Sequence, residues 1–321
     1  MESILSYLED YENLPEGITI EEHYKKWLNQ FDTYYHEAIT ETLDSLLKDF
    51  YVSKSYLKKS MKMAISDKKI TKLKPKKYWK HSYVLNCQKN GASQTLLSNM
   101  LIDSLDRRGI DYADSRDDCN RFVYVDDFSF TYGRVSQDLA ELAAMYPGAD
   151  VDVIIPVTYS YNHFHFKRSN NLDLNLSVFF RKKIENTVYH KNTSGVFWPH
   201  VDSLQNEDFK KVIEYYDYDI GKLRTAHIQT KSFENPHARY LAEEAFTIYG
   251  ARILESLQDK KNFKPLGISP YNDSLGFGAA CFSYRNCPNT APLVFWWGSY
   301  DDERGTALDW YPLTKRKGYN Q

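Results

Sequence analysis

The sequence predicts an α/β protein built around a parallel sheet. Short apolar runs typical of strands alternate with stretches in which apolar residues recur at steps of three and four, as on one face of a helix. The run at residues 151–157 is apolar enough to lie inside a sheet that is covered on both faces. Successive strand–loop–helix units with short loops favour parallel strands joined by right-handed crossovers.

The elements of this sheet begin at about residue 81. We expect strands at 82–85, 121–125 and 151–157, a helix that carries Leu96, Leu97, Met100, Leu101 and Leu105, and a helix at 135–146 that ends at Pro147 and Gly148. Ligands of such sheets bind at the carboxyl ends of the strands. The polar loops after the first two strands fall there, so the pattern predicts a ligand site at that edge.

The rest of the chain gives weaker signals. Residues 159–234 are polar and rich in tyrosine and asparagine, with short strand-like runs at 174–180 and 223–230, and we interpret them as an insertion or hood. Asn235 and Pro236 predict a helix start, and that helix continues to about residue 257. The segments 276–283 and 293–297 are predicted to be strands.

Charge is distributed unevenly along the chain. Residues 1–50 hold twelve acids against three lysines, and their apolar spacing predicts helices with a break near Pro15 and Gly17. Eleven lysines and one acid follow between Lys54 and Lys80, in a segment that is predicted to be helical up to Pro75 and then extended. The basic face is either solvated, or paired with the acidic block, or a surface for RNA, DNA or a phosphorylated ligand.

Composition excludes several classes of protein. The 321 residues carry 41 basic and 43 acidic side chains, and this near-neutral total argues against a nucleic-acid coat protein. Mean hydropathy is −0.60 without a long apolar run, and acids occupy the N-terminus, so neither a spanning helix nor a secretory signal is predicted. Four cysteines without a CxxC pair predict neither a disulfide scaffold nor a structural zinc site. We expect a cytoplasmic protein.

Two adjacent carboxylates follow the second predicted strand. Asp126 and Asp127 must stay hydrated, paired or bound to a metal ion, because burying them without partners is costly. The turn after them opens a helix, and the free amides of a helix start can hold an anion. The pattern therefore predicts a site for a phosphorylated sugar, although acids at this place can also serve only to cap the turn.

The segment 123–134, VYVDDFSFTYGR, resembles the signature of type I phosphoribosyltransferases. The resemblance implies a Rossmann-like parallel sheet in which Asp126 and Asp127 hold the ribose hydroxyls of phosphoribosyl pyrophosphate. It also implies that Thr131, Tyr132, Gly133 and Arg134 line the loop around the 5′-phosphate. Mg²⁺ is implied as the cofactor, at Asp126 and Asp127 or carried by the substrate. Tyr132 replaces the first glycine of the motif; a bulky residue there disfavours a positive φ and could crowd the phosphate.

A second resemblance lies at residues 282–297, FSYRNCPNTAPLVFWW. This segment is similar to the Pro-Asn-aromatic ending of a divergent phosphoribosyltransferase-like group found in anti-phage and retron systems. The resemblance covers about residues 81–158 and 236–300. We therefore expect a phosphoribosyltransferase-like domain at 81–321, preceded by the helical region at 1–80 that the apolar spacing predicts. The resemblance implies an effector that partner proteins hold inactive until infection. A reverse transcriptase–noncoding RNA complex is one candidate partner.

Further binding residues are predicted in two loops. The loop 86–93 occupies the place where the phosphoribosyltransferases it resembles bind pyrophosphate. The resemblance implies that Lys89, Asn90, Gly91 and Ser93 take part, although a plain loop fits the residues as well. Arg285 and Asn289 lie in a polar turn, and we hypothesise that they reach the sugar or acceptor pocket.

Three functions follow from these patterns. The first is a glycosyltransferase-like or glycosidic-bond-cleaving effector of anti-phage defence that acts at C1′ of a phosphoribosyl or nucleotide substrate. The second is an inactive nucleotide sensor or scaffold subunit in which Tyr132 blocks turnover. The third is a nucleic-acid adaptor that uses the lysines between Lys54 and Lys80.

Overall fold

A parallel sheet with its helices occupies the middle of the chain, and a mainly helical unit is assembled from both ends. In the computed structural model, Lys54–Glu185 forms the first compact unit, which we call the sheet unit. Met1–Ser53 and Asn186–Gln321 together form the second, the helical unit. The structure describes residues 2–87, 92–159, 166, 171–184, 194–255, 257, 263–269, 273–285, 287–301, 305–306 and 308–315.

Every strand pair described in the sheet unit is parallel. The strands are β2 (Ser82–Val84), β3 (Arg121–Val125), β4 (Phe128–Ser129), β5 (Ala149–Tyr159) and β6 (Leu174–Ile184). β2 pairs with β3, β3 and β4 pair in turn with one edge of β5, and β6 pairs with the other edge of β5. The central strand β5 is therefore paired along both edges. Its residues 151–157 are all buried, as predicted for this segment.

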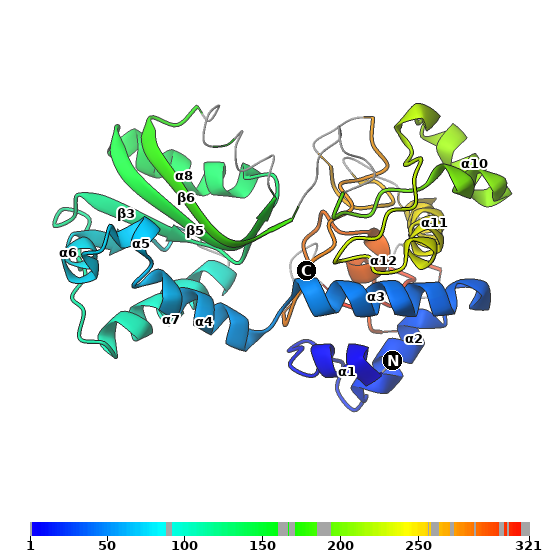
Figure 1. Cartoon of the computed structure of the whole chain (residues 1–321), viewed down its shortest axis with the longest axis horizontal. Helices are drawn as coiled ribbons and strands as arrows, with labels where there is room; N and C mark the ends of the chain where they lie inside the picture. Colours follow the sequence, from blue (N-terminus) through cyan, green and yellow to red (C-terminus); the bar gives the residue numbers. More distant parts are fainter. Residues whose placement is uncertain are drawn as a thin grey trace. The chain divides into compact units, whose positions relative to one another are not determined.

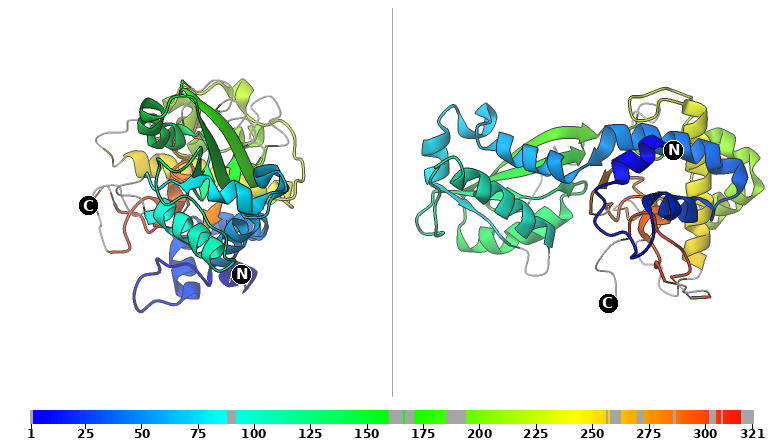
Figure 2. Two further views of the ribbon diagram at one scale, coloured as in Figure 1. Left: turned by 90° about the vertical axis from the view of Figure 1, so that its left-hand side faces the viewer. Right: turned by 90° about the horizontal axis from the view of Figure 1, so that it is seen from below.

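Helices cover both faces of this sheet. They are α4 (Lys54–Ala64), α5 (Lys68–Thr71), α6 (Pro75–Lys80), α7 (Ala92–Asp106) and α8 (Gly133–Met145). The buried face of α8 packs its valine and leucines into a core with alternate residues of β3 and β5. α4 and α7 pack together against the opposite face, as Figure 1 shows and Figure 2 repeats from two other directions. The predicted α/β fold with a parallel sheet is confirmed.

The helical unit is organised around one long buried helix, α11 (Pro236–Glu255). Its other elements are α1 (Glu2–Leu8), α2 (Ile20–Leu28), α3 (His36–Phe50), α10 (Glu207–Tyr215), α12 (Leu293–Trp296), the short 3-10 helices η1 (Thr33–Tyr35), η3 (Val201–Gln205) and η4 (Ile220–Lys222), and the parallel pair β1 (Tyr51–Val52) and β7 (Phe282–Ser283). α11 packs along α3, and an aromatic cluster of Trp27, Phe31, Phe246 and Phe295 fills the space beside it.

Several predicted elements differ from the structure. Residues 293–296 form a helix rather than a strand, because a short apolar run does not distinguish a strand from one buried helical turn. Pro75 does not start an extended segment: it opens α6, where its missing amide hydrogen is not needed. The predicted strand at 223–230 contributes only isolated bridges of Arg224 and Thr230, and of the segment 276–283 only β7 is a strand.

The compact units do not follow the predicted division at residue 80. The lysine-rich helices α4–α6 belong to the sheet unit, and β6, predicted to lie in the insertion 159–234, extends the sheet. All four cysteines are free thiols. Among the described helices, none combines the length and the apolar character that crossing a membrane requires.

Candidate functional site

Asp126 and Asp127 lie between β3 and β4, two strands that pair one after the other with the same edge of β5. β3 ends at Val125, opposite Ile154, and β4 begins at Phe128, opposite Val157, so the two carboxylates interrupt one continuous row of partners for β5. Asp126 still donates its amide to the Ile154 carbonyl at 3.2 Å. The next residues of β5 include Pro156, which has no amide hydrogen with which to continue the ladder. The break places the acid pair at the carboxyl edge of the sheet.

The carboxyl group of Asp126 lies in an environment that disfavours its charge. The residue is only 6% exposed, and the Asp127 amide donates to its Oδ1 at 3.0 Å. Burial raises the pKa of Asp126 well above its ordinary value, and the negative charge of Asp127 raises this pKa further. A group that brings hydroxyl donors or positive charge to this edge would relieve both effects.

A third carboxylate, Asp138 on α8, lies beside the pair and was not predicted. The Tyr124 hydroxyl contacts Oδ2 of Asp138 at 2.8 Å and Oδ2 of Asp126 at 3.3 Å, and the Asp138 charge adds to the raised pKa of Asp126. Arg134, four residues earlier on the same helix, pairs its Nε with Asp138 Oδ1 at 3.0 Å. This i,i+4 spacing was the only signal for Asp138 in the sequence.

The start of α8 provides donors for an anion. The helix begins at Gly133 with no acidic residue in its first turn, and the Gly133 amide donates to Thr131 Oγ1 at 3.4 Å. Thr131 is exposed, and the Arg134 side chain is 59% exposed despite its ion pair. The first-turn amides of α8, a hydroxyl and a guanidinium therefore lie within four residues of each other, a few residues after the acid pair.

Tyr132 adopts the left-handed conformation and turns its ring into the core. Its φ is +59°, its side chain is buried, and its ring stacks on Phe166 with centroids 4.7 Å apart. Its hydroxyl is 2.5 Å from Thr158 Oγ1. Tyr132 thus adopts the positive φ that a bulky residue disfavours, and burial of its ring offsets a backbone cost of about 1–2 kcal/mol. The ring therefore packs in the core of the sheet unit, in the same cluster as Val135 of α8.

A family model that matches residues 24–316 covers most of the chain. The protein belongs to the PRTase-CE family. No curated protein and no solved structure matches the chain. The family is phosphoribosyltransferase-like, which confirms the predicted kind of fold and a phosphoribosyltransferase-like function. The match starts within α2, so it includes N-terminal residues that the recognised motifs did not reach.

The remaining predicted site residues of this PRTase-CE protein are more dispersed. Lys89, Asn90 and Gly91 lie outside the described residues, and Ser93 lies in the first turn of α7. Arg285 and Asn289 belong to the helical unit, where the Arg285 carbonyl accepts from Asn13 and the Asn289 carbonyl accepts from Ile268. The sheet unit alone therefore unites the acid pair with the segment Thr131, Tyr132, Gly133 and Arg134, and the roles of these residues in binding stay predictions.

Cys87 is not a nucleophile in this setting. Burial, and after it the negative charge of Asp138, raises the pKa of its thiol to about 11. The thiol is therefore protonated at neutral pH, whereas the thiolate is the reactive form of cysteine.

Replacing Tyr132 by glycine is expected to destabilise the protein by about 2–4 kcal/mol, as judged by urea unfolding. Loss of a buried aromatic ring costs about 3–5 kcal/mol, and glycine at a positive φ recovers about 1 kcal/mol. Tyr132→Phe, which loses only the bond to Thr158, should cost about 1 kcal/mol. A glycine variant as stable as the wild type would show that the buried ring contributes nothing.

Proposed function

We propose that this PRTase-CE protein catalyses substitution or cleavage at C1′ of a phosphoribosyl or nucleotide substrate. The observation that supports this proposal most directly is the position of the acid pair between β3 and β4, with the first turn of α8 following a few residues later. Breaking the bond from C1′ to pyrophosphate or to a base leaves positive charge on the sugar ring. Carboxylates held beside that ring stabilise the charge as it develops.

Each group of the site has a role in this reaction. Asp126 and Asp127 accept hydrogen bonds from the ribose hydroxyls, and their charge favours the oxocarbenium-like transition state. The first-turn amides of α8, with Thr131 and Arg134, hold the 5′-phosphate, since a helix start and a guanidinium both favour phosphate oxygens. Tyr132 anchors this loop to the core through its buried ring.

The donor set is suited to Mg²⁺. Asp126, Asp127 and Asp138 offer carboxylate oxygens, the ligands that Mg²⁺ prefers. Burial raises the pKa of Asp126, and the charges of Asp127 and Asp138 raise this pKa further. Asp126 and Asp127 would hold the ion, directly or through the substrate, and the ion would neutralise charge on a departing pyrophosphate.

The test is turnover by the purified chain. We expect phosphoribosyl pyrophosphate, or a nucleotide, with Mg²⁺ to bind and to release pyrophosphate or a base, detected by mass spectrometry. Calorimetric binding without any released product would favour the alternative, a nucleotide sensor or scaffold. The core position of the Tyr132 ring favours the enzyme, because the sensor hypothesis relied on that ring to block the loop. Absence of both binding and turnover would exclude both functions.

We place this activity in anti-phage defence, as a retron-type effector in the cytoplasm held inactive by partner proteins. The support is the similarity of residues 282–297 to the divergent group associated with such systems, beside the phosphoribosyltransferase signature at residues 123–134. Mass spectrometry of small molecules and tRNA, after the chain is induced without its partners in cells, should reveal a depleted nucleotide pool or a modified RNA. Unchanged pools in cells that tolerate the chain would contradict a toxic effector.

A second candidate function, nucleic-acid binding, is favoured by a basic groove in the sheet unit. A cavity of 1090 Å³ lies between residues of α4, α5 and α7 and the strand β6. Its cationic lining residues are Lys58, Lys59, Lys62, Lys68, Lys69, Arg107, Arg108 and Arg181, against the acids Asp67 and Asp103. The three arginines come from outside the lysine-rich segment, so the sequence had indicated only part of this surface.

Within the part of the chain that the structure describes, the cations of the basic groove outnumber its acids. None of its eight cations forms an ion pair there, and Arg108 donates a hydrogen bond to Ser66 Oγ at 2.9 Å. Among the described residues that line the groove none is aromatic, so they offer no surface for base stacking. These features fit the phosphate backbone of RNA or DNA, bound without regard to sequence.

Reversing three charges of the basic groove should weaken nucleic-acid binding and its dependence on salt. For a variant with Lys58→Glu, Lys62→Glu and Lys69→Glu, we expect the slope of log affinity against log salt to fall in magnitude by about 2–3, as for three lost phosphate contacts. The matched control reverses Lys76, Lys77 and Lys80, which make the same change in net charge on α6 outside the groove. Equal losses in both variants would exclude a specific groove. Fluorescence anisotropy with a labelled oligonucleotide measures the slope.

A further inference from the structure

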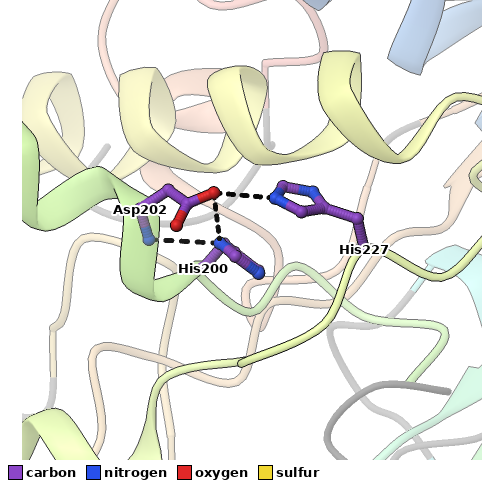
Figure 3. A group of neighbouring side chains, drawn as sticks. All are labelled: His200, Asp202 and His227. Atoms are coloured by element: carbon purple, nitrogen blue, oxygen red, sulfur yellow. Dashed lines mark hydrogen bonds and ion pairs between the residues drawn. The ribbon is translucent and has the colours of Figure 1, made fainter.

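Three metal-ligating side chains meet in the helical unit, remote in sequence from the acid pair. Figure 3 shows His200, Asp202 and His227 converging on one carboxylate oxygen. His227 Nε2 lies 2.8 Å and His200 Nδ1 lies 3.3 Å from Asp202 Oδ2, and one ligand atom from each residue lies within 4.8 Å of the others. We propose that these residues bind a divalent transition-metal ion of the zinc type. The proposal does not depend on the phosphoribosyl chemistry.

The backbone holds the two contributing segments together before any ion binds. His200 forms a parallel bridge with Arg224, in which the Val201 amide donates to the Arg224 carbonyl at 2.8 Å and the Arg224 amide donates to the Pro199 carbonyl at 2.9 Å. His200 caps η3, and Asp202 lies in its first turn. His227 follows three residues after the bridge, so both segments present their ligands from paired backbone.

The contact between His200 and Asp202 calls for a cation. Nδ1 of His200 accepts a hydrogen bond from the Asp202 amide at 3.1 Å, so this nitrogen carries an electron pair and not a proton. It nevertheless faces a carboxylate oxygen at 3.3 Å. Two acceptors at this distance repel each other, and a metal ion between them converts the repulsion into two coordinate bonds. The ion takes the place of the long hydrogen bond to the amide.

The spacing and the surrounding groups suit zinc. Ligand atoms about 2.0–2.1 Å from a tetrahedral ion lie about 3.3 Å from each other, as His200 Nδ1 and Asp202 Oδ2 already do. His227 Nδ1 is 3.4 Å from the Pro236 carbonyl, so coordination through Nε2 places the ring proton where this carbonyl accepts it. The ring of Tyr240 packs on both imidazoles, with centroids 6.0 and 5.3 Å away.

The donor set selects the class of metal. Two imidazole nitrogens and one carboxylate favour Zn²⁺, Co²⁺ or Ni²⁺ over Ca²⁺ and Mg²⁺, which prefer oxygen ligands alone. Three protein ligands leave one position for water, and the side chains of His227 and Asp202 are 35% and 42% exposed. The ion therefore reaches the site from solvent.

The experiment titrates the full chain, freed of metal by a chelator, with Zn²⁺ against a chromophoric competitor, and with Co²⁺ as a spectroscopic probe. We expect one ion per chain and the absorption bands of tetrahedral Co²⁺. His227→Ala and Asp202→Asn should each weaken affinity by about 100-fold or more. His237→Ala is the matched control, since this exposed histidine packs on Tyr240 at 5.0 Å but supplies no ligand atom.

Two results would overturn the proposal. One is a chain that binds no ion at this stoichiometry; the other is an ion whose affinity neither His227→Ala nor Asp202→Asn changes. Because both residues are partly exposed, we expect the metal-free variants to have the same midpoint of urea unfolding as the metal-free wild type. That measurement separates a lost ligand from a lost fold, and metal affinity is read without any assay of activity.

Discussion

Replacing Asp126 and Asp127 together by asparagine is expected to lower the rate at which a phosphoribosyl substrate is converted to product by about 10²–10³-fold. This is the usual effect of removing preorganised groups that stabilise developing charge in the transition state. Asparagine retains the size of aspartate and removes its charge, so binding of the 5′-phosphate at the start of α8 should persist while turnover falls. Initial rates and calorimetric binding on the same preparations measure the two quantities.

The stability of the same variants distinguishes a catalytic role from a structural one. The raised pKa of Asp126 means that folding favours its protonated form. The folded protein therefore binds more protons than the unfolded chain between the ordinary carboxyl pKa and the raised one, so its stability falls as pH rises through this window. Asp126→Asn removes that loss and should be at least as stable as the wild type at neutral pH.

The matched control for this pair is Asp117→Asn, an exposed acid of the same unit, which should change neither rate nor stability. Loss of stability together with activity in the Asp126 variants would show that the pair serves the fold. Full activity in the double variant would remove the enzyme proposal.

Replacing Glu243 by glutamine is expected to destabilise the helical unit by about 3–5 kcal/mol. Glu243 lies between Arg224 and Arg239, and all three side chains have no exposed surface. Its Oε1 accepts from Arg239 Nε and from the Trp198 amide, each at 2.8 Å, and its Oε2 pairs with Arg224. Without the carboxylate two guanidinium groups remain buried and unpaired, which is the costly case.

The pKa of Arg239 reports the same environment. Burial lowers it to about 10, although Glu243 raises it, and the charge of Arg224 adds to the decrease. Urea unfolding of Glu243→Gln measures the loss, and Glu214→Gln, exposed on α10, should lie within about 0.5 kcal/mol of the wild type. Combining Glu243→Leu with Arg224→Met and Arg239→Met should recover stability, since a neutral replacement of a buried ion cluster is tolerated. A loss below about 1 kcal/mol for Glu243→Gln would mean that the arginines find other partners.

The sequence predicted best the features that neighbouring residues determine together. The strand before Asp126, the acid pair and the helix from Gly133 follow one another within a few residues, so apolar spacing and turn chemistry were sufficient. The rotation of the Tyr132 ring was not predictable, because its partner Phe166 lies beyond β5 and shows no pattern of its own.

Sites that are assembled from distant segments could not be predicted from the sequence for the same reason. Arg181 joins the basic groove from β6, and His227 meets Asp202 across a segment with no recognised ligand spacing. The division of the chain was also missed, because the lysine-rich helices differ in composition from the strands on which they pack.

The path of the chain through its two units has a consequence for biosynthesis. The sheet unit is one continuous segment, whereas the helical unit needs Met1–Ser53 and everything from Asn186 onward. Since domains fold as units while the ribosome is still elongating, the half with the acid pair can mature before its discontinuous neighbour has a complete sequence. Nascent chains stalled after β6 has left the ribosome would already display this half, before a restraint that requires the finished protein can act on it.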